Sequence, residues 1–274
     1  MNIIIGAHIP RENTIIKTMD NIRKNGGNAL QLFTTNPRSL KISNNDKYIA
    51  ESHLIRKYCN IYNFHIIVHS PYAFNITKPF MIGKKHLAIF DTLIFNDLIT
   101  ANFIGAKGYV IHVGKSTTFS IIQSLNTMKQ NIKDIINLMI QHNINTKLLL
   151  ETPAGQGTEL LKNFNEFIDF YNSFTDIEKS VFKICIDTCH IWNAGYELSE
   201  ITDLIINKDD IFCIHLNNSK NIKGANLDRH EYLFNGKINP NDLREFIYNF
   251  PTSIIILEMP SNDYKKEIEF ILNI

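Results

Sequence analysis

Nine side chains of types that commonly bind transition metals recur near the ends of short apolar runs in the sequence. They are five histidines, two aspartates and two glutamates, namely His69, His112, Glu151, Asp187, His190, His215, Asp228, His230 and Glu258. A mixture of imidazoles and carboxylates suits Zn²⁺, Mn²⁺ or Fe²⁺ better than Mg²⁺ or Ca²⁺, which prefer oxygen ligands. Because nine ligands are too many for one ion, the pattern predicts two or three ions with positions left open for water or substrate.

Four of these nine side chains are carboxylates, which cannot crowd together without something that neutralises them. In a partly buried site they would repel one another and take up protons, whereas divalent cations would remove the conflict. A single histidine at such a position is more often a hydrogen-bonded core residue, and a single acid often caps the next helix. Recurrence at six successive strand ends favours a metal centre over separate structural roles.

Short runs rich in Val, Ile, Leu and Phe alternate along the chain with longer segments that have apolar residues at helical spacing. Such runs are typical of strands that helices cover on both faces. The predicted strands are Ile3–Ala7, Ala29–Thr34, Ile66–His69, Tyr109–Val113, Lys147–Glu151, Phe182–Asp187, Ile211–Leu216 and Ser253–Glu258.

This alternation predicts an α/β fold, a single-domain (β/α)8 TIM barrel over residues 1–274 with its active site at the C-terminal ends of the strands. An open doubly wound sheet would show the same alternation. It is less favoured because no G-x-G-x-x-G follows the first strand and no P-loop occurs. No linker, low-complexity tract or shift in composition divides the chain.

Composition limits the partners of the protein. Lys and Arg number 28 against 27 Asp and Glu, so the formal charge is +1 and binding to a polyanion must come from a local patch or from bound cations. The four cysteines form no C-x-x-C pair, which predicts reduced, mostly buried thiols of an intracellular protein. We expect neither a signal peptide nor a membrane span, since polar residues interrupt the apolar stretch Leu87–Ile104.

The sequence resembles the endonuclease IV family of apurinic/apyrimidinic (AP) endonucleases almost from end to end. Among the shared motifs, L-E-T-P-A-G-Q-G, C-I-D-T-C-H and the pair H-L-N and D-R-H are the most specific. The motifs lie at Ile5–His8, His69–Tyr72, Ile111–Gly114, Leu150–Gly157, Cys185–His190, His215–Asn217, Asp228–His230 and Ile256–Glu258.

The resemblance implies a monomeric enzyme with three Zn²⁺ per chain, for which Mn²⁺ could substitute. It would cut double-stranded DNA on the 5′ side of an abasic site, leaving a 3′-hydroxyl and a 5′-deoxyribose phosphate, and would also clear blocked 3′ termini. It would be cytoplasmic in a bacterium, and nuclear or virion-associated in a eukaryote or a large DNA virus. The implied ligand sets are His69, His112 and Glu151, then Glu151, Asp187, His215 and Glu258, then His190, Asp228 and His230. Glu151 would bridge two ions and position the attacking hydroxide.

The resemblance also implies contacts with damaged DNA. An abasic nucleotide has lost its stacking and pairing, so extruding it from the duplex costs less than extruding a normal one. Tyr72 would wedge into the base stack and Arg38 would insert into the DNA, although a packed aromatic and an ordinary loop cation are the simpler readings. Ala73 stands where a larger apolar wedge is common in the family.

Further basic residues and one histidine complete the candidate set. Lys115, Lys220 and Arg229 lie on loops that follow predicted strands, where they could contact phosphates. His8 follows the first strand, and either supports a metal ligand or simply packs there.

Two other functions fit part of the pattern. A single-metal sugar isomerase or epimerase on the same barrel would use only Glu151, Asp187, His215 and Glu258. The other five metal-binding residues have no purpose in such an enzyme. A non-catalytic module that binds damaged DNA is the second alternative, and the intact set of nine ligands argues against it.

Overall fold

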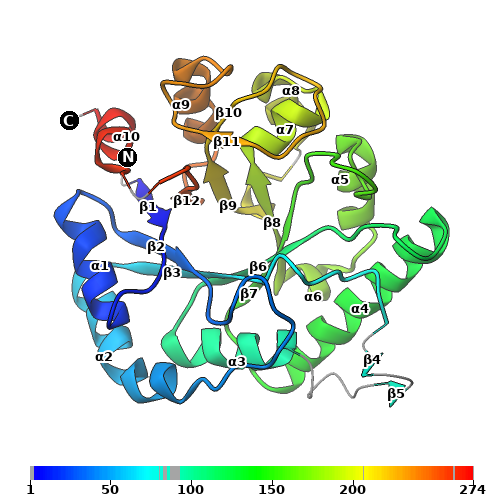
Figure 1. The fold of residues 1–274 in the computed structure, drawn as a ribbon, viewed down its shortest axis with the longest axis horizontal. Coiled ribbons are helices and arrows are strands. Elements are labelled where there is room, and N and C mark those ends of the chain that lie inside the picture. The colour runs from blue at the N-terminus through cyan, green and yellow to red at the C-terminus, as the bar shows by residue number, and fades with distance from the viewer. Residues whose placement is uncertain are drawn as a thin grey trace.

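The computed structural model describes residues 3–79, 81–82, 85–86, 93–205, 207–261 and 263–273. Eight parallel strands close into a barrel in the order β1-β12-β9-β8-β7-β6-β3-β2 (Figure 1). Their bounds are β1 Ile4–His8, β2 Ala29–Leu32, β3 His65–His69, β6 Gly108–His112, β7 Lys147–Glu151, β8 Phe182–Asp187, β9 Ile211–Leu216 and β12 Ile254–Leu257. All eight predicted strands and the predicted (β/α)8 barrel are confirmed. Because Ile4 of β1 pairs with Ile254 of β12, the sheet is closed and the doubly wound alternative is wrong.

Helices surround the ring of strands, as Figure 1 shows. Many of them begin at a capping side chain; Ser120 and Gln123, for example, form a reciprocal capping box at the start of α4. The helices are α1 Ile15–Lys24, α2 Asp46–Tyr62, α3 Leu93–Ile104, α4 Ile121–Gln141, α5 Phe164–Asn172, α6 Asp176–Lys179, α7 Thr188–Ala194, α8 Leu198–Leu204, α9 Pro240–Tyr248 and α10 Lys265–Leu272.

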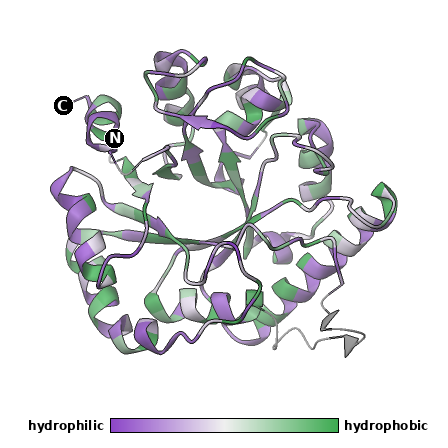
Figure 2. Cartoon of the chain, viewed as in Figure 1, coloured by the Kyte–Doolittle hydropathy of each residue, from purple (hydrophilic) through white to green (hydrophobic). Residues whose placement is uncertain are grey.

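The apolar core has two parts. The larger part lies between the strands and the helices, and Figure 2 shows hydrophobic residues along the strands and on parts of the surrounding helices. The smaller part fills the inside of the barrel with Ala29, Ile67, Val110, Leu149, Cys185, Cys213, Ile254 and Ile256. We call these eight residues the inner layer. They form an apolar floor beneath the C-terminal ends of the strands.

Two short antiparallel pairs lie outside the barrel: β4 Met81–Ile82 with β5 Lys85–His86, and β10 Asn218–Ser219 with β11 His230–Glu231. The second pair was not predicted and matters for the site, because it folds the long loop after β9 back over the barrel. Of the apolar stretch at residues 87–104, the structure describes residues 93–104, which form α3, and residues 87–92 lie outside the described residues. Among the described helices, none is long and apolar enough to cross a membrane.

Candidate metal centre

A spacing of two residues connects the inner layer to the candidate site. Side chains at positions i and i+2 of a strand point to the same face, so the residue two places after an inner-layer residue also faces the barrel axis. Six of the nine predicted ligands have this relation to the inner layer: His69, His112, Glu151, Asp187, His215 and Glu258. They therefore form the next layer toward the mouth of the barrel.

The carboxylate of Glu151 lies between two groups of imidazoles. Its Oε2 atom is 3.3 Å from Nε2 of His69 and 3.1 Å from Nε2 of His112. Its Oε1 atom is 3.1 Å from Nδ1 of His215 and 3.5 Å from Nδ1 of His190. Each oxygen faces a different set of ring nitrogens, which is the arrangement that a carboxylate bridging two ions requires.

His215 is the centre of the second predicted ligand set. Besides Glu151, its Nδ1 atom faces Oδ2 of Asp187 at 3.9 Å and Oε2 of Glu258 at 3.5 Å. Asp187 and His215 are completely buried, so this set lies deepest in the site. Asp187 also caps α7 by accepting a hydrogen bond from the backbone N–H of His190.

The third predicted set is brought together by α7 and the β10–β11 pair. Oδ1 of Asp228 lies 3.4 Å from Nε2 of His190 and 3.0 Å from Nε2 of His230. In the neutral imidazole of His190, Nδ1–H donates to the carbonyl oxygen of Thr152 at 2.8 Å, which leaves the lone pair on Nε2. That Nε2 atom is buried and has no hydrogen-bond partner. A buried nitrogen aimed at a carboxylate without a hydrogen bond fits a missing cation between them.

Two residues that contact predicted ligands, Gln31 and Asn217, were not identified from the sequence. Gln31 of β2 is completely buried; its amide nitrogen donates to Oε1 of Glu258, and its amide oxygen lies 2.9 Å from Nε2 of His215. The amide nitrogen of Asn217 donates to Oδ2 of Asp187 at 2.8 Å. His8, whose role was left open, lies 2.7 Å from Oε1 of Glu258 through its Nδ1 atom. Ala29 of the inner layer is two residues before Gln31, so the same spacing rule would have found it.

The charges of the cluster are already paired in the protein without metal. Burial by itself raises the pKa of a carboxyl and lowers that of an imidazole, but here opposite charges nearby outweigh burial. They lower the pKa of three carboxyls, those of Glu151, Asp228 and Glu258. They raise the pKa of four imidazoles, those of His112, His190, His215 and His230, the last to about 9. Without metal, these shifts favour ionised carboxylates and protonated imidazoles at those seven positions, whereas burial lowers the pKa of His69. The sequence-based expectation that the carboxylates would take up protons is wrong for Glu151, Asp228 and Glu258.

A cavity of about 280 Å³ opens above these residues. Its lining comprises His8, His69, Tyr72, His112, Glu151, His190, Asp228, His230, Glu258 and Met259. Asp187 and His215 lie beneath it. A larger cavity of about 390 Å³ lies beside α5, α6 and β8 and contains none of the nine predicted ligands.

The five predicted DNA contacts are placed less uniformly. Tyr72 lines the cavity with 58% of its surface exposed, in ring contact with Phe33 and His69. The other four, which are Arg38, Lys115, Lys220 and Arg229, do not line the cavity. Arg38, Lys220 and Arg229 are exposed. The ammonium group of Lys115 lies 3.3 Å from Oε1 of Glu159, and this carboxylate partly neutralises the charge of the lysine.

Comparisons with known proteins show the family to which the chain belongs. Residues 19–274 match the family model of xylose isomerase-like TIM barrels. The "Probable endonuclease 4" of Mycoplasmopsis agalactiae is 32% identical to this chain, and the match covers 98% of this chain and 97% of the relative. The chain belongs to the endonuclease IV family. The "Probable endonuclease 4" of Clostridium botulinum is also 32% identical, over 97% of each chain.

Solved structures place this endonuclease IV family member among related barrels. Endonuclease IV from Thermus thermophilus superposes with a TM-score of 0.74 at 21% identity, over 98% of this chain and 96% of that one. A D-tagatose 3-epimerase-like protein superposes with a TM-score of 0.73 at 14% identity, over the same shares of the two chains. At these identities the similarity shows a shared fold, so the chemistry must be argued from the side chains.

The paired charges predict how the stability of the metal-free protein depends on pH. The pKa of His230 is raised from 6.5 to about 9, so its contribution is complete below pH 6.5 and is lost as the pH rises through about 9. The pKa of Glu258 is lowered from 4.5, so its contribution is present above pH 4.5 and is lost as the pH falls. We therefore expect the chelated protein to have its highest melting temperature between about pH 4.5 and pH 6.5, and a lower one on both sides of that range.

Metal-loaded protein should keep its melting temperature above neutral pH, because bound metal requires neutral imidazoles and takes over the role of the protons. Thermal melts with and without chelator, over the same series of buffers, test this. The same pH dependence in both forms would contradict the paired-charge description of the cluster.

Proposed function

We propose that this protein is a base-excision-repair endonuclease that hydrolyses the phosphodiester bond 5′ to an abasic site in double-stranded DNA. The products would be a 3′-hydroxyl and a 5′-deoxyribose phosphate, and the same site would remove blocking groups from 3′ termini. The observation that carries the proposal is the carboxylate of Glu151, whose two oxygens face separate groups of imidazoles. The names of the curated relatives support the same activity.

The nine ligands would hold three Zn²⁺ ions in the three sets predicted from the sequence. When bound, zinc supplies Lewis-acid stabilisation of negative charge and activation of water near neutral pH. Four carboxylates with three divalent cations would leave the centre with a net charge of about +2, which attracts a phosphodiester although the whole chain is nearly neutral. All nine ligands come from one chain, and we propose that the protein acts as a monomer.

The side chains of this protein have separate tasks in that reaction. Glu151 holds the two deeper sets in fixed relation, and the hydrogen bonds of Gln31 and Thr152 fix the orientation of His215 and His190. The inner layer excludes water from below, which strengthens every charge interaction in the site. The extruded residue would enter the cavity of about 280 Å³, and an abasic sugar phosphate needs less room there than a nucleotide that keeps its base.

Metal content and incision together distinguish this proposal from its alternatives. We expect about three zinc ions per purified chain by plasma mass spectrometry, and cleavage of a duplex that contains one tetrahydrofuran site. About one ion per chain and no incision would favour a sugar epimerase, whose fold the chain shares. Binding of the damaged duplex without cleavage in zinc would favour a non-catalytic module.

Replacing Tyr72 by alanine tests the proposed wedge. Its exposed ring lines the cavity, where it can stack on a base of bound DNA. We expect KM for the tetrahydrofuran duplex to rise by about 5- to 150-fold, the factor that corresponds to the binding free energy of one base–aromatic stack. Bound zinc should not change, because Tyr72 is not among the ligands. Tyr62→Ala is the matched control, since Tyr62 is a half-exposed tyrosine at the end of α2, the helix that leads into the N-terminal end of β3. Equal KM values for the two variants would remove Tyr72 from the DNA interface.

A further inference from the structure

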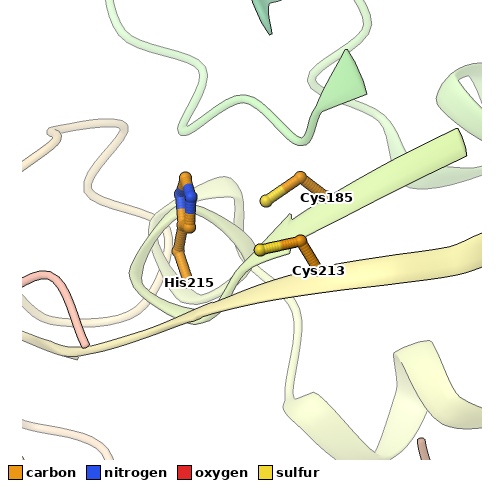
Figure 3. A group of neighbouring side chains, drawn as sticks. All are labelled: Cys185, Cys213 and His215. Atoms are coloured by element: carbon orange, nitrogen blue, oxygen red, sulfur yellow. The ribbon is translucent and has the colours of Figure 1, made fainter. Parts of the chain in front are cut away.

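Two cysteines lie one layer below the metal centre, inside the barrel. Cys185 of β8 and Cys213 of β9 are direct partners in the parallel ladder, and both are completely buried. Cys213 precedes His215 by two residues, so both side chains point to the same face of β9. In Figure 3 both sulfur atoms point toward the ring of His215. From the sequence, these thiols have no predicted role beyond burial.

These three side chains form a donor set of two sulfurs and one imidazole. Their donor atoms all lie within 4.8 Å of one another. Both cysteines are free thiols, and the other members of the inner layer are apolar, so no charged side chain of that layer competes for them. Thiolate and imidazole together prefer thiophilic cations, whereas Mg²⁺ and Ca²⁺ prefer oxygen.

This thiol set shares one residue with the centre above it. Nδ1 of His215 lies 3.1 Å from Oε1 of Glu151, and Nε2 lies 2.9 Å from Oε1 of Gln31. A cation held by the two sulfurs would draw on the imidazole that the proposed function assigns to the second ion. Occupation of the thiol set therefore opposes occupation of the centre above.

We propose that Cys185, Cys213 and His215 form an inhibitory binding site for one thiophilic divalent cation, such as Cd²⁺ or Hg²⁺. Binding forms two metal–sulfur bonds and one metal–nitrogen bond, and it releases both thiol protons to solvent. Two thiolates and a divalent cation carry no net charge together. The apolar inner layer can hold such a neutral group, whereas it would strongly disfavour an unpaired charge.

Cadmium titration of the zinc-loaded protein tests this site, followed by the ultraviolet charge-transfer absorption of cadmium–thiolate bonds and by incision of the tetrahydrofuran duplex. We expect the absorption to saturate at one equivalent and incision to fall in parallel. Cys213→Ala should abolish this absorption and weaken cadmium binding by at least about 10-fold, the loss that even a ligand's supporting partner causes. Measured against its own activity without cadmium, this variant should resist inhibition.

Cys59→Ala is the matched control, because Cys59 is a partly buried free thiol on α2, far along the chain from the set. It should keep both the absorption and the inhibition. Cys185→Ala repeats the test from β8 if Cys213→Ala folds poorly in a thermal melt. Absorption that survives in both inner-layer variants would overturn the proposal. So would inhibition without thiolate absorption, because cadmium would then be replacing zinc among the nine ligands. The absorption decides the matter even if the chain proves to have no nuclease activity.

Discussion

Glu151→Gln should lower incision of a tetrahydrofuran duplex by about 10³-fold or more, the upper range for loss of one electrostatic group. The substitution keeps the size of the side chain but replaces one of its two oxygens by an amide nitrogen, which cannot bind a cation. Because Oε2 faces His69 and His112 while Oε1 faces His215, one change disturbs two ligand sets. We therefore expect bound zinc to fall by about one to two ions per chain.

Two comparisons make this result specific. Glu245→Gln changes an exposed glutamate on α9 and should leave zinc content and incision as in the wild type. A thermal melt of chelated Glu151→Gln separates loss of ligands from loss of fold. Incision within tenfold of wild type, with three ions still bound, would show that the bridging role is wrong.

The fold was predictable because its signal is repeated. Eight runs of strand type alternate with helical segments, and an error at one boundary does not change the count. The structure moves strand ends by two residues at most, as where β2 ends at Leu32 and not at Thr34. The period of two then accounts for the placement of six predicted ligands, since each stands two residues after an inner-layer residue.

Gln31 could not be found from its residue type alone. It obeys the same spacing as the ligands and lies between His215 and Glu258, yet glutamine is not a usual metal ligand and was passed over. The spacing of two residues finds every inward-facing position, whereas a search by residue type finds only the usual metal ligands. At the ends of the barrel strands, each inward-facing residue is either a predicted ligand or, like His8 and Gln31, contacts one.

The remaining parts of the site depend on contacts between segments distant in sequence. The D-x-H pattern places Asp228 and His230 on a loop, but their approach to His190 requires the β10–β11 pair. That pair is held by the amide of Asn218, which donates to the carbonyl oxygens of Leu233 and Ile238. No local sequence pattern predicts that the loop after β9 folds back in this way. The DNA contacts were harder still, because an exposed Arg38 looks the same in sequence whether or not it binds a phosphate.

His190→Asn should remove one ion per chain and lower incision by about 10²- to 10³-fold. Asparagine can keep the hydrogen bond to the carbonyl oxygen of Thr152, but it places no atom where Nε2 of His190 faces Asp228. The set His190, Asp228 and His230 would then lack one of its three ligands, whereas the set around Glu151 would stay intact. His53→Asn, an exposed position on α2, is the matched control and should change neither quantity.

The number of ions that this variant retains decides whether the three ligand sets are separate. We expect two retained ions and a smaller loss of activity than in Glu151→Gln. His190 approaches Glu151 only at 3.5 Å, whereas its Nε2 atom lies 3.4 Å from Oδ1 of Asp228 and has no hydrogen-bond partner. Loss of all ions would mean that the nine ligands bind metal as one cooperative unit. Retention of all three would mean that Asp228 and His230 hold the third ion without His190. Either outcome would contradict the proposal that His190, Asp228 and His230 hold an ion of their own. The buried Nε2 atom of His190, which has no hydrogen-bond partner, would then not be explained by a missing cation.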